Sequence, residues 1–316
     1  MTNKNKLLTL LILSSSAVVT TALINKCIKL SATSKNSLEA HSSLCYHWRF
    51  GDIHYTKVGS GKPLLLIHDL DAASSGYEWS QVISDLKENY TVYTLDLLGC
   101  GRSEKPYLTY TNYLYVQLIS DFIKSEIGHR TDIIATAAST EFTIMACSNN
   151  PELFDRIMLI NPDSILSCSQ IPGRYGKFYK AFLDLPVIGT LLYNIAFSRQ
   201  VLKETFLKNY FHNPYAVKES YLNAYHEAAH LGASAKSVYA SVHCNYTRCN
   251  ITSALKKIDN SIYLVGGSDM SHIEELLKEY TQYNSAIEYS LIPDTKFLPQ
   301  LEKPSALIST IRMFFS

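Results

Sequence analysis

Ser139 and Asp269 have the types and positions in this sequence that best suit catalysis. Each follows a short apolar run typical of a buried strand, and open α/β sheets bind ligands at the carboxyl ends of such strands. A serine hydroxyl becomes a nucleophile when a histidine accepts its proton and an acid orients that histidine. The Ser139 hydroxyl and the Asp269 carboxylate are two of the three kinds of group that this chemistry requires, and a histidine base is the third.

Both residues also have a purely structural interpretation. Ser139 and Thr140 stand where a helix is predicted to begin, and a hydroxyl there caps the free N–H groups of the first turn. Asp269 ends the stretch Gly-Gly-Ser-Asp, which suits a simple turn equally well. The sequence leaves both interpretations open.

The elements that must position these residues alternate between short apolar runs and helical stretches from His47 onward. This order predicts an α/β fold with a mostly parallel, doubly wound sheet. Residues 48–58 read as an opening hairpin, while residues 77–87 and 111–127 read as helices. The strands predicted after the hairpin are residues 63–68, 90–96, 132–136, 157–161, 261–265 and 287–292.

The alternation stops between Asp163 and Ile258, where the pattern is mainly helical and rich in tyrosine, phenylalanine and alanine. We expect this insertion to cover the carboxyl ends of the strands. The predicted organisation is therefore a core formed by residues 46–163 and 259–316, with a helical cap formed by residues 164–258.

The N-terminus carries an apolar run, residues 7–24, without a charge or a proline. Because a helix of roughly 20 apolar residues crosses a bilayer, residues 1–30 are predicted to be a single-pass membrane anchor and residues 31–45 a polar tether. A cleaved signal peptide is the alternative, but Asn25 and Lys26 make a poor cleavage site. Lysines flank both ends, so the side of the membrane stays open.

Composition excludes several classes of function. The net charge of +1 does not suit nucleic-acid binding, which needs a basic surface. The seven cysteines match no zinc or redox spacing, and no nucleotide-binding or metalloprotease motif occurs. The sequence predicts no cofactor, no metal and no nucleic-acid partner, which leaves the membrane and a hydrophobic small molecule as expected partners.

Three phrases in sequence order resemble the α/β-hydrolase family with a helical cap. They are residues 64–69 (LLLIHD), residues 96–106 (DLLGCGRSEKP) and residues 298–304 (LPQLEKP). The resemblance extends from about Phe50 to Phe315. It implies a nucleophile on a tight strand-to-helix turn, a catalytic histidine, an acid and two backbone amides that bind the oxyanion.

The resemblance places the nucleophile in one of two registers. Ser139 fits if Ala137 and Glu141 replace the usual glycines, and Ala137 fits the usual distance to Pro151 but has no hydroxyl. The acid is expected at Asp269, with Asp163 as the alternative position.

The resemblance also exposes departures from the family pattern. Phe297 stands at the expected histidine position and cannot move a proton. His272 could substitute, although a solvent-exposed histidine at a helix start explains it more simply. The oxyanion loop is predicted at Asp69 and Leu70, and a carboxylate there would repel a developing oxyanion. Four further histidines are expected to face solvent or packing in the cap: His212, His226, His230 and His243.

These departures lead to competing functional hypotheses. The first is a membrane-anchored, catalytically impaired relative of serine hydrolases that binds a hydrophobic ligand or a partner. The alternative is an active hydrolase of small hydrophobic esters that uses Ser139, Asp269 and an unrecognised base. A third hypothesis is a purely interactive protein whose cap packs on a partner.

Overall fold

The computed structural model describes residues 3–38 and 43–316, with side chains described from Ser15 onward. Its centre is an eight-stranded sheet with the order β1-β2-β4-β3-β5-β6-β7-β8. The first two strands are antiparallel to their neighbours and the others pair in parallel, as the sequence predicts. The strands are β1 (Ser43–Trp48), β2 (Gly51–Val58), β3 (Lys62–Ile67), β4 (Tyr90–Leu95), β5 (Thr131–Thr136), β6 (Phe154–Ile160), β7 (Ile262–Gly267) and β8 (Glu288–Ile292).

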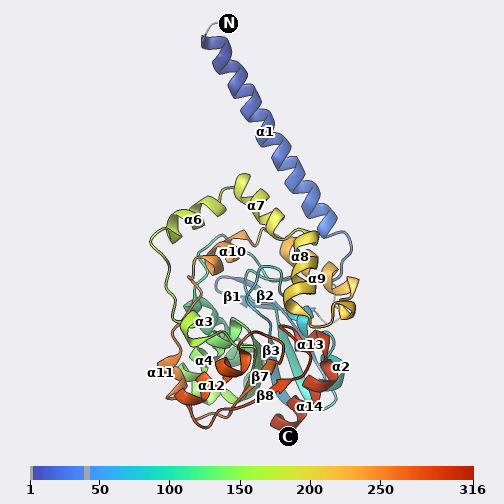
Figure 1. The fold of residues 1–316 in the computed structure, drawn as a ribbon, viewed down its shortest axis with the longest axis vertical. Coiled ribbons are helices and arrows are strands. Elements are labelled where there is room, and N and C mark those ends of the chain that lie inside the picture. Colours follow the sequence, from blue (N-terminus) through green and yellow to red (C-terminus); the bar gives the residue numbers. More distant parts are fainter. Residues whose placement is uncertain (1–2, 39–42) are drawn as a thin grey trace.

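Helices cover both faces of the sheet (Figure 1). One apolar layer includes side chains from α3 (Asn112–Phe122), α4 (Ser139–Asn149) and α12 (Ile273–Tyr283). The other includes side chains from α2 (Ile83–Leu86) and α14 (Pro304–Phe315). The central strands must therefore be apolar on both sides, which explains why β3 reads as one continuous apolar run.

The segment between β6 and β7 is helical and lies at one end of the sheet (Figure 1). A third cluster, rich in aromatic side chains, joins these helices to loops of the sheet. The helices are α5 (Ile165–Cys168), α6 (Gly176–Leu183), α7 (Ile188–Ala196), α8 (Arg199–Thr205), η4 (Phe206–Tyr210), η5 (Pro214–Ala216), α9 (Glu219–His230), α10 (Lys236–His243) and α11 (Thr252–Leu255). We refer to this segment as the cap.

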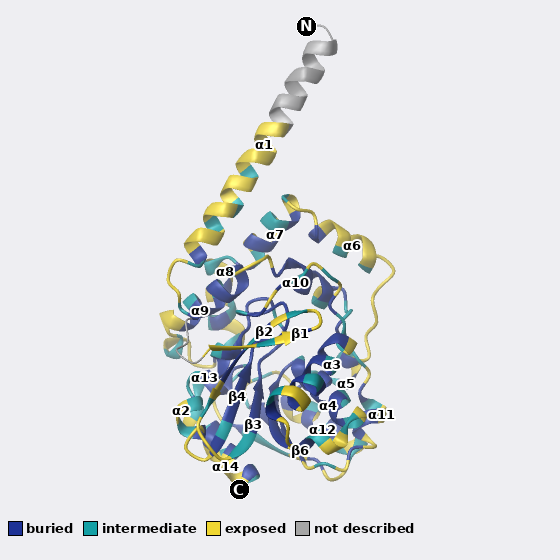
Figure 2. Ribbon diagram, turned by 180° about the vertical axis from the view of Figure 1, so that it is seen from behind, coloured by how far each residue is buried: buried dark blue, intermediate teal, exposed yellow. Residues whose placement is uncertain are grey.

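The N-terminal helix α1 (Asn3–Ala32) projects from the cap (Figures 1 and 2). In the part of the chain that the structure describes, none of the helices combines the length and the apolar character that crossing a membrane requires. The predictions of a transmembrane anchor and of membrane localisation are therefore wrong for the described residues. Much of the apolar run lies among residues 7–14, whose side chains are outside the description. From Ser15 onward, hydroxyl residues, Asn25 and two lysines leave a stretch well short of roughly 20 apolar residues.

The second half of α1 docks on the cap through polar contacts. The Asn25 side chain donates to the Val187 carbonyl at 3.2 Å and accepts from Asn194 at 2.9 Å. Lys29 donates to the Gly232 carbonyl. These contacts fix the second half of α1 against α7 and against the loop that follows α9.

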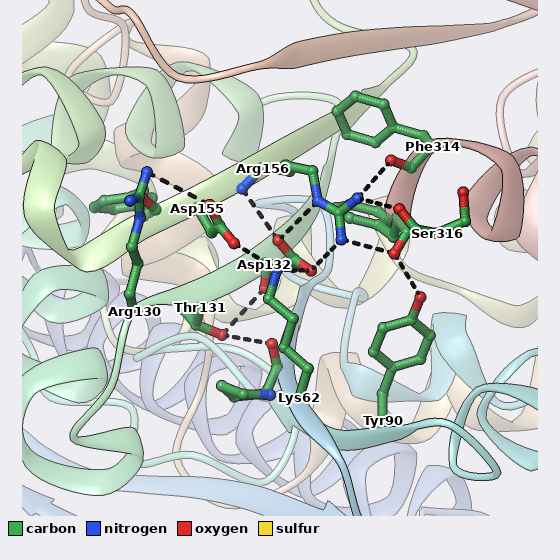
Figure 3. A network of polar contacts seen from close by, with 12 residues as sticks. Lys62, Tyr90, Arg130, Thr131, Asp132, Asp155, Arg156, Phe314 and Ser316 are labelled. Atoms are coloured by element: carbon green, nitrogen blue, oxygen red, sulfur yellow. Dashed lines mark hydrogen bonds and ion pairs between the residues drawn. The ribbon is translucent and has the colours of Figure 1, made fainter.

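A polar network ties α14 to the strands at their amino ends (Figure 3). The Arg156 guanidinium donates to the carbonyls of Phe314 and Phe315 at 3.0 and 2.6 Å. It also lies 3.3 Å from the carboxylate of Asp132, which Lys62 contacts at 2.8 Å. This network stabilises the end of the sheet opposite the residues that could do chemistry.

Candidate functional site

The turn between β5 and α4 is built around Ala137. Its φ of +46° lies in the left-handed region, which non-glycine residues seldom adopt. In α/β-hydrolases a strained turn of this kind presents the nucleophile. Ala135 and Ser139, two residues to either side, are small enough for the tight turn. The backbone thus has the conformation of a nucleophile turn at position 137, where the side chain is a methyl group.

Ser139 lies in the first turn of α4 and is fully buried. Its hydroxyl donates to the carbonyl of His68 at 2.5 Å, which joins α4 to the loop after β3. The His68 ring accepts from the Leu97 amide through Nε2, at 2.9 Å. The Ser139 hydroxyl and the His68 imidazole are therefore both engaged in buried hydrogen bonds to the backbone.

Phe297, at the expected histidine position, lies in the loop after β8. Its ring stacks on Tyr210 of the cap, with centroids 5.0 Å apart and planes 20° apart. Its carbonyl accepts from the side chain of Asn161 at 2.9 Å. At the position where the resemblance predicts the catalytic histidine, an aromatic ring instead packs the core against the cap.

The Asp69 carboxylate accepts a hydrogen bond from the backbone amide that the resemblance predicts as an oxyanion donor. In the family, one oxyanion donor is the N–H of the residue after the nucleophile. That N–H belongs here to Ala138, and it donates to the Asp69 carboxylate at 3.1 Å. Leu70, the next residue of the predicted oxyanion loop, is buried. Burial, followed by repulsion from Glu78 and Asp71, holds the pKa of Asp69 well above its usual range.

Glu78 lies beside Asp69 and is completely buried. Its carboxylate accepts from the Tyr225 hydroxyl at 3.1 Å, the Asp69 amide at 3.2 Å and the Thr136 hydroxyl at 3.4 Å. Burial raises the pKa of Glu78 to about 7, and burial likewise raises the pKa of Asp71. Asp69 and Glu78 thus contact Ala138 and Thr136, the residues on either side of Ala137, and both acids have a raised pKa. Sequence reasoning missed Glu78, because nothing in the sequence indicates its burial.

Asp269 follows β7 and pairs with a histidine of the cap. Its carboxylate contacts Nδ1 of His212 and accepts from the Ser268 hydroxyl at 2.7 Å. The hydrogen bond from Ser268, then the one from His212, lowers the pKa of Asp269. His212 was expected to face solvent or packing, and no sequence signal connects residues 57 positions apart.

His212 also lines a polar pocket of about 410 Å³ between the cap and the loop after β8. The other lining residues are Asn213, Pro214, Ala216, Asp294, Glu302 and Lys303. An imidazole oriented by a carboxylate at the edge of a pocket is an arrangement that can take up a proton.

The remaining candidates have other partners. Asp163 and Glu141 both contact the Arg248 guanidinium, Glu141 at 2.7 Å, and Glu141 also accepts from the Cys249 amide at 2.9 Å. This ion cluster joins α4 to the last part of the cap. His272 is exposed at the start of α12, with a φ of +57°.

Comparisons with known proteins agree with this architecture. The family model described as "Alpha/beta hydrolase family" matches residues 64–308. The chain therefore belongs to the α/β-hydrolase family.

Two curated relatives match parts of the chain. A 2-hydroxy-6-oxo-6-(2'-aminophenyl)hexa-2,4-dienoic acid hydrolase of Metapseudomonas resinovorans is 37% identical over 75 residues, which cover 23% of this chain and 26% of the relative. A soluble epoxide hydrolase of Corynebacterium sp. (strain C12) is 29% identical over 146 residues, which cover 46% of each chain. The matched region is thus less than half the length of either relative.

Solved structures show the same fold over more of the chain. The epoxide hydrolase CorEH has a TM-score of 0.69 at 21% identity and covers 87% of this chain and 98% of its own. A serine hydrolase involved in carbazole degradation also has a TM-score of 0.69, at 17% identity, covering 87% of this chain and 99% of its own. At these identities the likeness establishes the fold alone.

Proposed function

We propose that this protein keeps the α/β-hydrolase fold without serine–histidine–acid catalysis, and that it binds a small hydrophobic molecule between cap and core. The observation that carries the proposal is the positive φ of Ala137, since the turn conformation is retained while the nucleophile is a methyl group. Ser139, the other register, has its hydroxyl on the His68 carbonyl inside the core.

The surrounding contacts support the same proposal. Phe297 cannot accept a proton, and loss of a triad member typically costs several orders of magnitude in rate. The Asp69 carboxylate already accepts from the Ala138 amide, so an oxyanion would have to displace it. A single oxyanion donor is worth about 2.7–4 kcal/mol in such enzymes.

The proposed ligand class rests on the aromatic side chains that gather at the cap–core junction. Phe297 stacks on Tyr210, and Tyr210 in turn contacts the rings of Phe206 and Tyr225. Apolar, aromatic surfaces with a few polar groups are typical of small-molecule sites. The curated relatives are named for an aminophenyl-substituted dienoic acid and for epoxides, and the first of these compounds carries an aromatic ring.

Ester turnover tests the proposal. We expect the native protein and Ser139→Ala to hydrolyse a p-nitrophenyl ester no faster than the buffer does. The combined variant Ala137→Ser, Phe297→His and Asp69→Gly should hydrolyse it faster, because it restores the nucleophile, the base and the free amide. Native turnover that disappears in Ser139→Ala would overturn the proposal.

A second candidate function is that of an active hydrolase, and the contact between Asp269 and His212 favours it. The carboxylate fixes the imidazole, so His212 would be the base that the sequence did not reveal. In this case His212→Ala should abolish turnover that the native protein shows, and Asp269→Asn should reduce it. The first proposal predicts no turnover for these substitutions to remove.

A further inference from the structure

The edge of the sheet opposite β8 carries a cluster of metal-ligating side chains that is separate from the candidate site. Cys45 and His47 stand two residues apart on β1, so both side chains point to the same face. Asp52 of β2 is paired directly with His47 in the antiparallel register, which places it on that face as well. A thiol, an imidazole and a carboxylate are thus brought together by the β1–β2 hairpin.

The potential ligand atoms are already close. The Cys45 sulfur, an imidazole nitrogen of His47 and a carboxylate oxygen of Asp52 all lie within 4.8 Å of one another. Nδ1 of His47 is 2.7 Å from the Asp52 carboxylate and 4.0 Å from the Cys45 sulfur. Zinc bonds of about 2.3 Å to sulfur and 2.0–2.2 Å to nitrogen and oxygen put ligands of a tetrahedron about 3.3–3.6 Å apart. To reach that geometry the His47–Cys45 separation would close by about 0.5 Å and the His47–Asp52 separation would open by about 0.7 Å. The Cys45–Asp52 separation would close by at most about 1.2 Å.

We propose that Cys45, His47 and Asp52 form a site for a divalent metal ion of the zinc type. A thiolate with an imidazole favours zinc and its neighbours in the periodic table over magnesium or calcium, which prefer oxygen ligands. Three protein ligands leave a fourth tetrahedral position for water. On binding, the Cys45 thiol releases its proton to solvent, and the neutral imidazole keeps its proton on Nε2 while Nδ1 binds the metal.

The backbone of the hairpin holds the site in place, although its side chains are exposed. All six residues of β1 pair with β2, and β2 continues into the sheet through β4. His54 faces Cys45 across the hairpin, but its Nε2 contacts the Ser43 hydroxyl at 2.5 Å, and we assign the fourth position to water for this reason. A bound ion would join the edge strand to its only paired neighbour among the described strands.

Cobalt spectroscopy on the full chain tests the site directly, with Co²⁺ as the probe for the zinc position. We expect one ion per chain, a near-ultraviolet sulfur-to-cobalt charge-transfer band and the visible bands of tetrahedral cobalt, all of which Zn²⁺ should displace. Cys45→Ser should abolish the charge-transfer band. His47→Ala and Asp52→Asn should each weaken cobalt binding by more than about tenfold. Even the loss of a residue that only hydrogen-bonds to a metal ligand typically costs about tenfold in affinity.

Cys27→Ser is the matched control, because Cys27 is the other exposed cysteine of the described chain and lies on α1. It should leave the cobalt spectrum and the affinity unchanged. The proposal is overturned if the native protein shows no sulfur-to-cobalt band, or if the band survives in Cys45→Ser. Circular dichroism of each variant separates a lost ligand from a lost fold.

Discussion

Replacing Glu78 by glutamine should make this protein more stable at high pH and less stable at low pH. Glu78 is completely buried, and its pKa rises from 4.5 to about 7 in the folded chain. An acid with a raised pKa stabilises the folded state below the unfolded pKa, and this contribution is lost as the pH rises through the folded pKa. The expected window is therefore pH 4.5 to 7.

The size of the effect follows from the shift and the hydrogen bonds. A difference of about 2.5 units corresponds to about 3 kcal/mol of unfolding free energy lost across the window. Glutamine removes that loss, and its carbonyl oxygen can still accept from the Asp69 amide. Its NH₂ group, however, cannot accept from the Tyr225 hydroxyl as the Glu78 carboxylate does, which costs about 1 kcal/mol at every pH. Glu78→Gln should thus be about 1 kcal/mol less stable than the native protein at pH 4.5 and about 2 kcal/mol more stable at pH 8.

Urea unfolding at half-unit steps between pH 4.5 and 8 measures both curves. The native and variant curves should cross at about pH 5, where the native protein has lost about 1 kcal/mol of the total. Glu88→Gln is the control, since Glu88 is exposed and should leave the pH dependence unchanged. Parallel native and Glu78→Gln curves would refute the reasoning, because the buried carboxyl would then not be titrating in this range.

Three further predictions concern stability in urea unfolding. Ser139→Ala should lose about 1–2 kcal/mol, because the His68 carbonyl loses its buried donor, and a loss of zero would show that this hydrogen bond is not formed. Arg248→Met should lose about 3 kcal/mol by leaving the Glu141 carboxylate buried without its cation, whereas an unchanged stability would contradict the ion cluster. Ala137→Gly should keep or raise the free energy of unfolding, because glycine adopts a positive φ without strain. Ala146→Gly within α4 is the control and should cost about 1 kcal/mol. Equal losses in the two variants would argue against strain at the turn.

Much of the fold could be predicted from the sequence, because its signals are local. Residues 64–67 are apolar at every position and form the interior of β3, buried on both faces. Residues 111–127 have helical periodicity and form α3 and the π turn η2 (Ile123–Ile127). The helix predicted at residues 77–87 is instead split into η1 (Gly76–Trp79) and α2, and local periodicity did not indicate this break.

The predicted membrane-spanning helix was wrong for the part of the chain that the structure describes. Residues 7–24 contain neither charge nor proline, but Thr20 and Thr21 and the serines before them interrupt the apolar run. The helix itself was predictable. Its docking on α7 through Asn25 was not, because that contact joins residues 162 positions apart.

The site could be predicted only in part, since its contacts join distant segments. The sequence left two registers for the nucleophile position, and the positive φ at Ala137 distinguishes their backbone conformations. The contact of Asp69 with the Ala138 amide and that of His212 with Asp269 depend on how loops meet in space. Residue types alone could not reveal either contact.

The most direct test of the central proposal is reaction with an alkylphosphonate that traps activated serines, followed by mass spectrometry of the peptides. The proposal predicts no adduct on the native protein or on Ser139→Ala. It predicts an adduct at position 137 of the combined variant Ala137→Ser, Phe297→His and Asp69→Gly, in which the Ala138 amide is free. An adduct on Ser139 of the native protein would contradict the proposal and establish a working nucleophile where the structure shows a buried hydroxyl.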